Sequence, residues 1–344
     1  MKRLNNLYQQ ICSLDNLRLA DEKARKGKGW QYGVRLHDSN REANLIALHQ
    51  MLVNKTYCTS AYDIFKVYEP KERDVYRLPY YPDRITHHSV MNILEPVFVS
   101  VFTADTYSCI KKRGIHAAAK NVKKALRNVP GTQYCLKLDV KKFYPSIDHA
   151  VLKQLLRRKI KDADLLWLLD EIIDSAEGLP IGNYLSQYLA NFYLTYFDHW
   201  LKEVIKVKYY FRYCDDLVIL SDSKEHLHSV FVSIEQYLNE KLLLKVKGNW
   251  QIFPVAARGI DFVGYRFFHT HTLIRKSIKK SFARMLAKRR NDQSIASYMG
   301  WMKHCNAHHL TKTLMTNEPL QRLRHYSTGT GIHRRQNKTK SGAQ

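Results

Sequence analysis

The sequence lacks closely spaced cysteine pairs. Its six cysteines are scattered along 344 residues and include no CxxC pair. Zinc sites and disulfide frameworks usually place cysteines at short, recognisable spacings. We therefore expect no zinc site and no disulfide framework. We predict reduced, mostly buried thiols at Cys12, Cys58, Cys109, Cys135, Cys214 and Cys305.

Long apolar runs are also missing. The longest candidate, residues 90–102, is interrupted by Glu95 and Pro96, whereas a membrane-spanning helix needs about 20 predominantly apolar residues. The opening residues, MKRLNNLYQQICSLDN, lack the uninterrupted apolar core of a signal peptide. These absences predict a cytoplasmic chain without a membrane partner.

The chain has no internal repeat, no low-complexity linker and no Pro/Gly-rich stretch before its last few residues. Its 45% of apolar residues can form a sizeable core, and its length suits two or three subdomains. Because nothing separates these subdomains, we expect them to pack tightly or to interleave. Residues 327–344 are basic with few apolar side chains, which predicts a disordered tail.

Acidic residues are few beside the basic ones. The chain has 31 Asp and Glu against 56 Lys and Arg, a formal charge of +25. Such an excess on a folded protein most simply indicates a polyanionic partner, and nucleic acid is the first candidate. An anionic membrane surface would suit the same charge.

Apolar periodicity predicts a compact α+β domain with a mostly antiparallel sheet. Strand-like alternation occurs in residues 132–144, 242–253 and 259–268, and as two strands about a tight turn in 208–221. Helical spacing occurs in residues 39–53, 116–128, 149–175 (divided near Lys161), 183–204 and 224–240, and again in the basic stretch from Arg275. Residues 69–84 have the prolines and alternation of extended structure and turns.

Three aspartates carry the strongest chemical signal. Asp215 and Asp216 occupy the predicted turn between two apolar strands, and Asp139 ends another predicted strand. Asp-Asp alone is a common turn sequence, but two charges at the tip of a buried hairpin are costly without cations. Converging carboxylates suit a pair of Mg²⁺ ions about 3.5–4 Å apart, an arrangement that supports phosphoryl transfer.

A second motif, GLPIGNYLSQ, leads into a predicted helix. Gly182, Ser186 and Ala190 recur at every fourth position, so one face of this helix carries small side chains. A base pair or a backbone could approach that face closely. Close packing against another helix explains the same pattern equally well.

Together these motifs resemble the reverse transcriptases, in an ordered series of five. The series is LDVKKFYPSID, GLPIGNYLSQ, FRYCDD, LKVKGNWQIF and FVGYRF. The resemblance implies a right-hand polymerase fold, with a palm built of an antiparallel sheet with helices on one face. It also implies four regions: an N-terminal extension and fingers in residues 1–132, a palm in 133–270 with finger-side elements near 150–180, a helical thumb in 271–326, and the tail.

The resemblance also implies roles for individual residues. Metal ligands would be Asp139, Asp215, Asp216 and the backbone carbonyl of Val140, and Lys247, or else Lys245, would protonate the pyrophosphate. Residues near the incoming dNTP would be Lys71, Arg73, Arg77, Phe143, Ile181, Gly182 and Tyr144, the last as the gate against a 2′-hydroxyl. Residues at the template and primer would be Ser186, Gln187, Tyr213, Phe262, Val263, Gly264 and Tyr265. Each aromatic or charged residue among them could instead be a core side chain or a solvated charge.

Two positions depart from most reverse transcriptases. Ile181 replaces a Gln in the second motif and Gln187 replaces a Pro, a form that is similar to reverse transcriptases of diversity-generating retroelements. The resemblance then implies a template RNA copied into cDNA with errors at template adenines, and a small basic helical accessory protein. The alternatives are a group II intron or antiphage-defence reverse transcriptase, and a non-catalytic RNA-binding protein on a polymerase fold.

Overall fold

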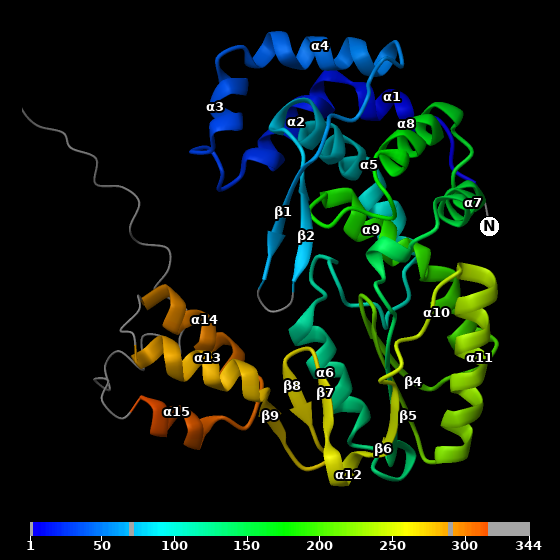
Figure 1. Ribbon diagram of the computed structural model, residues 1–344, viewed down its shortest axis with the longest axis vertical. Coiled ribbons are helices and arrows are strands. Elements are labelled where there is room, and N and C mark those ends of the chain that lie inside the picture. Colours follow the sequence, from blue (N-terminus) through cyan, green and yellow to red (C-terminus); the bar gives the residue numbers. More distant parts are fainter. Residues whose placement is uncertain (1–2, 69–71, 288–291, 316–344) are drawn as a thin grey trace, which may run out of the picture.

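The computed structural model describes residues 3–68, 72–287 and 292–315. Figure 1 shows a helical half above a half that is built on two sheets, with three helices beside the second sheet near the end of the described chain. A hairpin of two strands points down from the helical half toward the sheets. No helix among the described residues is long and apolar enough to cross a membrane.

The helical half combines the start of the chain with segments from its middle. Its helices are α1 (Tyr8–Cys12), α2 (Leu14–Arg25), α3 (Tyr32–Asp38), α4 (Arg41–Val53), α5 (Ile85–Val101), α7 (His149–Lys159), α8 (Ala163–Asp174) and α9 (Tyr184–Tyr193). Its hairpin pairs β1 (Asp63–Val67) with β2 (Arg73–Arg77) in antiparallel register, and the short turn η1 (Tyr80–Arg84) joins β2 to α5. Side chains from all but the hairpin meet in one apolar core, which α7 and α8 join from the middle of the sequence.

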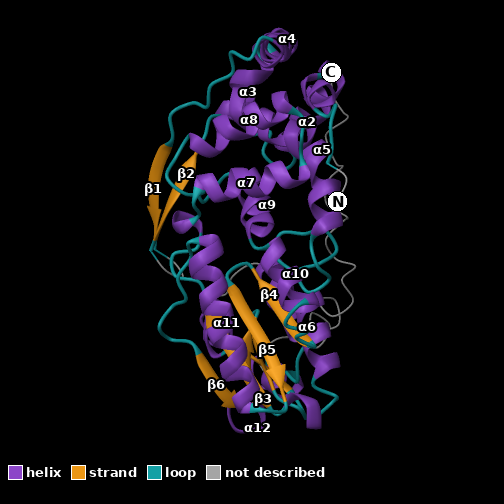
Figure 2. Cartoon of the chain, turned by 90° about the vertical axis from the view of Figure 1, so that its right-hand side faces the viewer, coloured by secondary structure: helices purple, strands orange, loops and turns teal. Residues whose placement is uncertain are grey.

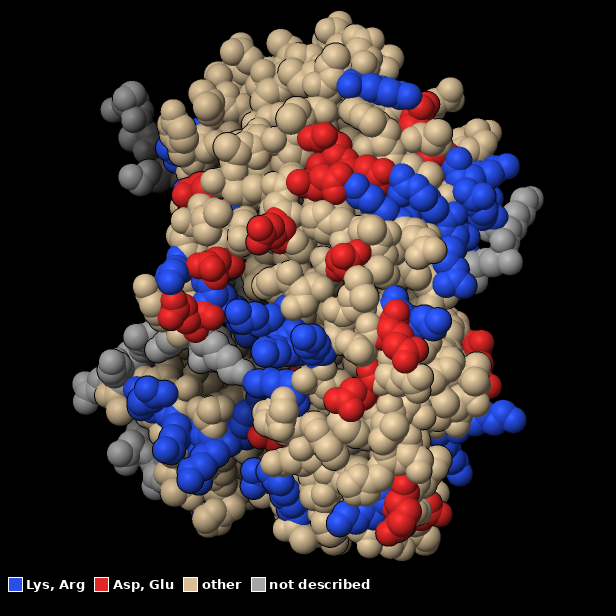
Figure 3. Space-filling model, turned by 45° about the vertical axis from the view of Figure 1, so that its right-hand side comes forward, with Lys and Arg blue, Asp and Glu red and all other residues tan. Residues whose placement is uncertain are grey.

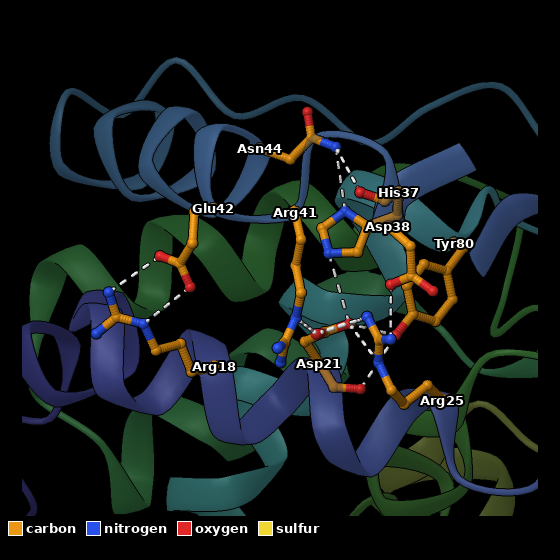
Figure 4. A network of polar contacts seen from close by, with 9 residues as sticks. All are labelled: Arg18, Asp21, Arg25, His37, Asp38, Arg41, Glu42, Asn44 and Tyr80. Atoms are coloured by element: carbon orange, nitrogen blue, oxygen red, sulfur yellow. Dashed lines mark hydrogen bonds and ion pairs between the residues drawn. The ribbon is translucent and has the colours of Figure 1, made fainter. Parts of the chain in front are cut away.

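A buried carboxylate ties together the first helices of this half. Asp21 is fully buried on α2 and accepts hydrogen bonds from Arg25 Nη2 at 2.8 Å, Arg41 Nε at 2.6 Å and the Tyr80 hydroxyl at 2.5 Å. His37 Nε2 lies 3.5 Å from the same carboxylate. Because these partners come from α2, α3, α4 and η1, one aspartate fixes four elements around it (Figure 4).

The lower half is organised around a four-stranded antiparallel sheet in the order β4-β5-β3-β6. Its strands are β3 (Tyr134–Asp139), β4 (Tyr209–Tyr213), β5 (Asp216–Ser221) and β6 (Gln251–Pro254). Figure 2 shows this sheet in the lower half, with β1 and β2 at the edge of the upper half. The alternation of side chains along the strands assigns each residue to one of two covered faces.

The two faces of this sheet are covered differently. One face presents Leu136, Leu138 and Ile219 to the core shared with the helices, and α11 (Lys224–Leu242) packs against β3, β5 and β6. The opposite face presents Cys135 and Val218 to a second core. That core contains side chains of α6 (Ile115–Ala125) and of a three-stranded antiparallel sheet, β7 (Ile260–Phe262), β8 (Tyr265–Phe267) and β9 (Thr272–Ile274).

The described chain ends in three helices that continue this second core. They are α13 (Lys276–Ala287), α14 (Asp292–Met302) and α15 (His308–Leu314). Phe282 and Met299 are buried against the three-stranded sheet. The disordered tail predicted for residues 327–344 lies outside the described residues.

Most predicted elements form, including the division of residues 149–175 into α7 and α8, but the structure corrects three expectations. The single helix predicted for residues 183–204 is two helices, α9 and α10 (Thr195–Glu203), which meet at Leu194. The Thr195 hydroxyl donates to the Asn191 carbonyl at 3.1 Å, and such a bond tends to bend a helix. Residues 242–253 form a strand only from Gln251, and 259–268 form a hairpin of two strands.

The third correction concerns the cysteines. All six are free, but only Cys12 and Cys135 are buried. Cys58 is exposed, and the other three are partly buried. The prediction of burial from residue type was therefore wrong for the thiols that lie in turns and at element ends.

Candidate active site

The structure brings two of the predicted metal ligands together. Asp139 at the end of β3 lies directly opposite Asp216 at the start of β5, so their side chains emerge on the same face of the sheet. Asp215 occupies the turn between β4 and β5, and its carbonyl accepts a hydrogen bond from the Val140 amide at 3.2 Å. The turn is tight because Cys214 adopts a left-handed conformation with φ of 60°. The three aspartates thus gather at one end of the sheet.

Asp216 is a partly buried carboxylate, and its side chain is 23% exposed. Burial is the largest cause that raises its pKa, to about 7; Lys137 opposes the shift, whereas Asp139 and Asp215 add to it. The Lys137 ammonium lies 3.5 Å from Asp216 Oδ2, but Oδ1 is buried with no hydrogen-bond partner among the described residues. A carboxylate in this position repels further negative charge and favours a cation.

The donor set fits a hard divalent cation. Such ions prefer carboxylate and carbonyl oxygens, and the partnerless oxygen of Asp216 faces the same edge as Asp139. Within the described ranges, no three His, Cys, Asp or Glu side chains already converge on one metal position. A cation at this edge would therefore draw the carboxylates together as it binds.

The two candidate general acids lie on the segment beside β3. The Lys247 amide donates to the Asp139 carbonyl at 2.8 Å, and the Lys141 amide donates to the Lys245 carbonyl at 2.8 Å. Together with the pairing of Val140 and Val246, these bonds set Lys247 opposite Asp139 and Lys245 one step further from the carboxylates. The placement sets Lys247 nearer to Asp139 than Lys245.

The predicted gate residue contacts the aspartate turn. The Cys214 thiol donates to the Tyr144 hydroxyl at 3.4 Å, and burial is the main cause that raises the pKa of Tyr144. Tyr144 is partly buried, so one side of its ring remains open beside the turn. Phe143 is buried in the core and packs edge-on against Tyr144. It therefore supports the Tyr144 ring, and the Phe143 ring itself has no open surface that a nucleotide could contact.

The second motif lies between the aspartates and the β1–β2 hairpin. The Leu179 amide donates to the Tyr144 carbonyl at 2.9 Å, and the Ile181 carbonyl accepts from the Tyr76 amide at 2.8 Å. A Cβ on Gly182 would stand 2.3 Å from the Tyr76 carbonyl, and its φ is +129°. Only glycine therefore allows this loop to bind the hairpin so closely. Ile181 itself is half-buried.

Two of the three predicted fingertip cations are on β2. Arg77 is exposed, forms an ion pair with Asp63 and lies over the Phe65 ring. Arg73 is exposed and forms no ion pair with any described residue, so its charge is available to an anion. Lys71 lies outside the described residues.

A cavity of about 190 Å³ separates the hairpin from the start of α5 and α9. Arg84 lines it without an ion pair to the described chain, and His87 lines it with a buried Nε2 that has no hydrogen-bond partner. His88 stacks on Tyr184 with ring centroids 4.7 Å apart. The sequence analysis missed these residues, because their neighbours in the cavity come from two other segments of the chain.

The predicted template and primer residues lie in different surroundings. Ser186 is buried on α9, whereas Gln187 is exposed one position further on. Tyr213 is half-buried opposite Asp216, and burial is the main cause that raises its pKa. Of these three, Gln187 and Tyr213 have surface that a nucleic acid could contact.

The predicted primer grip forms the turn of the β7–β8 hairpin and is largely covered. Phe262 and Tyr265 are fully buried, and Val263 is 8% exposed. A Cβ on Gly264 would lie 2.3 Å from the Trp301 ring, and the Tyr265 hydroxyl donates to the Trp301 carbonyl at 3.1 Å. The structure therefore seats α14 on this turn, and the side chains chiefly hold that contact.

A second cavity, of about 260 Å³, lies beside Asp139 and Lys137. Arg258 and Arg266 line it together with Asp261. Lys137 was missed in the sequence analysis, although its place two residues before Asp139 in an alternating strand puts it on the same face. On the face shown in Figure 3, Lys and Arg gather in a band across the middle and lower left, while Asp and Glu form separate groups.

Fold and sequence comparisons define the class of protein. The structure is similar to that of apo telomerase from Candida tropicalis, with a TM-score of 0.51, 13% identity, and coverage of 78% of this chain and 56% of the other. This similarity confirms the predicted right-hand polymerase fold, so the four-stranded sheet is the palm. Residues 69–267 match the reverse transcriptase (RNA-dependent DNA polymerase) family. The chain belongs to this family.

Two curated relatives are also similar over part of the chain. Protein YkfC of Escherichia coli K12 is 24% identical over 58% of this chain. The group II intron-encoded protein LtrA of Lactococcus lactis subsp. cremoris is 28% identical over 38% of it. The chain spans 65% of YkfC and 23% of LtrA.

Proposed function

We propose that the chain is an RNA-directed DNA polymerase that makes cDNA at Asp139, Asp215 and Asp216. The observation that carries the proposal is the buried, partnerless oxygen of Asp216 on the same face as Asp139, in a chain of the reverse transcriptase family. A site with this charge needs a cation, and phosphoryl transfer uses one. We assign two Mg²⁺ ions to it, held by the three carboxylates and the Val140 carbonyl.

The reaction forms one bond and breaks another. The primer 3′-hydroxyl gives up its proton to water, its oxygen bonds to the α-phosphorus of the dNTP, and the bond to the β-phosphate oxygen breaks so that pyrophosphate leaves. Divalent ions held by the three carboxylates would favour loss of that proton and stabilise the charge on the leaving group. Lys247 delivers a proton to the pyrophosphate, while Arg73 and Arg77 hold the triphosphate.

Shape around the site selects the sugar and the template. Tyr144, braced by Phe143, excludes a 2′-hydroxyl at the turn. Gly182 allows the second motif to lie against β2, so that the base pair forms beside Ile181. The cavity with Arg84 and His87 receives a template nucleotide, because a base and its phosphate suit a half-open space with an unpaired cation.

We place the remaining nucleic-acid contacts along the three-stranded sheet of β7, β8 and β9. We assign the primer strand to the cavity beside Lys137, whose arginines suit phosphate. Phe262 to Tyr265 support this strand through the backbone of their turn, and Gln187 and Tyr213 line the approach of the duplex. We assign residues 1–132 to the N-terminal extension and fingers, 133–270 to the palm and 271–326 to the thumb.

The test of polymerase activity is primer extension on an RNA template with Asp215→Asn. Loss of a metal ligand should lower kcat by about a thousandfold, equivalent to about 4 kcal/mol of transition-state stabilisation. Asp222→Asn is the matched control, since Asp222 is an exposed aspartate beyond the end of β5. Full extension by a folded, RNA-binding Asp215→Asn protein would exclude the proposed site.

For the kind of reverse transcriptase, we infer the diversity-generating type from Ile181 and Gln187. A branched apolar residue in place of Gln removes a polar group beside the incoming base, so base selection should be looser, with errors at template adenines. A small basic helical accessory protein would assist. Sequencing of cDNA made by the purified protein and by Ile181→Gln tests this. The variant should show fewer errors, and an unbiased, low error rate in the native protein would remove the inference.

A group II intron-type reverse transcriptase is the second candidate, favoured by the similarity to LtrA. The RNA that copurifies with the protein separates the two. An intron-like structured RNA would favour this candidate, whereas a repeat-containing template RNA would favour the diversity-generating type.

A further inference from the structure

A fully buried arginine stands directly before the aspartate turn. Arg212 lies on β4 with no exposed surface, and its side chain points away from the face that carries Asp216. Its Nε and Nη2 donate to both oxygens of Asp198, at 2.8 Å and 2.6 Å. Asp198, on α10, is fully buried as well. Two charges removed from water in this way require close mutual pairing.

The guanidinium does more than pair with Asp198. Its Nη1 donates to the Cys214 carbonyl at 3.1 Å and to Asn191 Oδ1 at 3.1 Å. The planar fork of arginine allows one group to serve a carboxylate on one side and two oxygens on the other. Arg212 thus connects the aspartate turn to α9 and α10.

Two other contacts of the turn involve Val140 and Tyr144. The Val140 amide holds the Asp215 carbonyl, and the Cys214 thiol contacts the Tyr144 hydroxyl at 3.4 Å. Cys214 adopts a left-handed conformation, which a non-glycine residue keeps only when its surroundings hold it there. The Arg212 contact to the Cys214 carbonyl is therefore a side-chain link on the helix side of the turn.

The same arginine reaches the second motif through α9. Asn191 Oδ1, which accepts a hydrogen bond from the guanidinium, lies on α9, and this helix begins two residues after Gly182. The Asn191 side chain in turn donates to the Ser108 carbonyl at 2.8 Å. The carboxylate turn and the loop that faces the incoming nucleotide are therefore attached to one buried cation.

We propose that Arg212 is a positioning residue, which aims Asp215 and Asp216 at the bound cation through the Cys214 carbonyl and keeps their turn in register with the second motif. Asp198 and Asn191 hold the guanidinium for this task. The inference rests on the proposed polymerase function. A purely structural arginine would affect folding alone, whereas a positioning arginine also affects metal affinity and kcat.

The test compares Arg212→Lys with Tyr210→Phe. Lysine keeps the charge beside Asp198, but its three donors share one nitrogen, so it cannot span the carboxylate and the Cys214 carbonyl as the planar fork does. Tyr210→Phe removes a 2.7 Å hydrogen bond to the same Asp198 from the same strand and leaves the turn contact in place. Both lose a buried contact, but only the first releases the turn.

Two readouts are needed, each corrected for the folded fraction. In primer extension, Arg212→Lys should lower kcat at least about tenfold with KM for dNTP within about threefold, and should raise the Mg²⁺ concentration for half-maximal rate. In a calorimetric titration with Mn²⁺ alone, its affinity should fall about tenfold. Tyr210→Phe should match the native protein in both. Equal metal affinity and kcat for the two variants would make Arg212 a stabilising residue only.

A milder variant serves if Arg212→Lys does not fold. Asn191→Ser keeps the ion pair with Asp198 and shortens the side chain that shares Nη1 with the Cys214 carbonyl. It should shift Mn²⁺ affinity in the same direction by about threefold, and unchanged affinity would overturn the proposal. The Mn²⁺ titration also separates failures, because it can succeed even if the native protein extends no primer.

Discussion

Asp21 in the helical half is fully buried, the Asp216 side chain in the palm is 23% exposed, and the two carboxylates have opposite numbers of donors around them. Asp21 accepts hydrogen bonds from Arg25, Arg41 and Tyr80. Asp216 has the Lys137 ammonium at 3.5 Å and one buried oxygen with no partner. The first carboxylate is saturated with donors, and the second is not.

The difference appears in their acidities. Burial would raise the pKa of Asp21, but the hydrogen bonds from Arg25, Tyr80 and Arg41 outweigh it and lower that pKa below its usual range. At Asp216 burial prevails and the pKa rises to about 7. A saturated carboxylate stabilises the fold, whereas an undersaturated one destabilises it until a cation arrives.

The largest expected effect is on the saturated site. Asp21→Asn should lower the free energy of unfolding by about 3–5 kcal/mol, because it removes the fully buried carboxylate that the partly buried Arg25 and Arg41 bind. Urea denaturation at neutral pH measures the change. Asp15→Asn is the control, since its side chain is 97% exposed and its surface pair with Arg18 should contribute little to stability. Equal losses for the two variants would contradict a special role for Asp21.

The second prediction concerns pH in the metal-free protein, with a chelator present. The raised pKa means that folded Asp216 binds its proton more tightly than unfolded Asp216. The contribution of the protonated carboxyl to folding stability is therefore complete below the usual pKa of 3.8 and is lost as pH rises through about 7. The loss corresponds to roughly 4 kcal/mol. Asp216→Asn should abolish it in denaturation curves measured from about pH 4 to 8.

Asp21 is an internal control for that experiment, because its contribution to stability depends on pH in the opposite direction. Its lowered pKa gives stability that is present above 3.8 and lost as pH falls through the lower, folded value. The difference between native protein and Asp21→Asn should therefore shrink in acid. Parallel pH profiles for the Asp21 and Asp216 variants would break the comparison.

The fold was largely predictable where local patterns decide it. Alternation around two adjacent aspartates predicted the β4–β5 hairpin, and its pairing with β3 set Asp139 beside Asp216. Helical spacing predicted α7, α8 and α11. These elements depend on neighbours within a few positions, which a single sequence contains.

Features that depend on distant partners were not predictable. The helix breaks at Leu194, close to Asn191. The Thr195 hydroxyl donates to the Asn191 carbonyl, and Arg212, which is far away in sequence, donates to the Asn191 side chain. Burial of the β7–β8 turn depends on Trp301. The cavity beside Gly182 combines three segments of chain. The periodicity of residues within one element gives no information about such contacts between distant segments.

A smaller effect should distinguish charged from neutral acceptors. Tyr80→Phe removes a hydrogen bond to the Asp21 carboxylate and should cost about 1.5–3 kcal/mol. Tyr8→Phe removes a buried hydrogen bond to the neutral Leu52 carbonyl and should cost about 0.5–1.5 kcal/mol. Thermal denaturation of both proteins measures the difference, and a larger loss for Tyr8→Phe would contradict the saturation of Asp21.

The smallest effect is expected at Lys137. Lys137→Met removes the cation beside Asp216 and should move the pH midpoint of the stability loss upward by about one unit. Lys153→Met is the control, because that lysine has a similar exposed fraction and pairs with Asp174, away from the palm. A shift of the same size in both variants would show that Lys137 does not act on Asp216.

The central claim is that the undersaturated Asp216 carboxylate and its neighbours in the palm bind a divalent cation. The most direct test is a calorimetric titration of Mn²⁺ into the native protein, Asp216→Asn and Asp21→Asn, each bound to an RNA–DNA primer-template. We predict that Asp216→Asn weakens binding at least about tenfold, while folded Asp21→Asn binds like the native protein. Equal Mn²⁺ affinity for Asp216→Asn and the native protein would contradict the account.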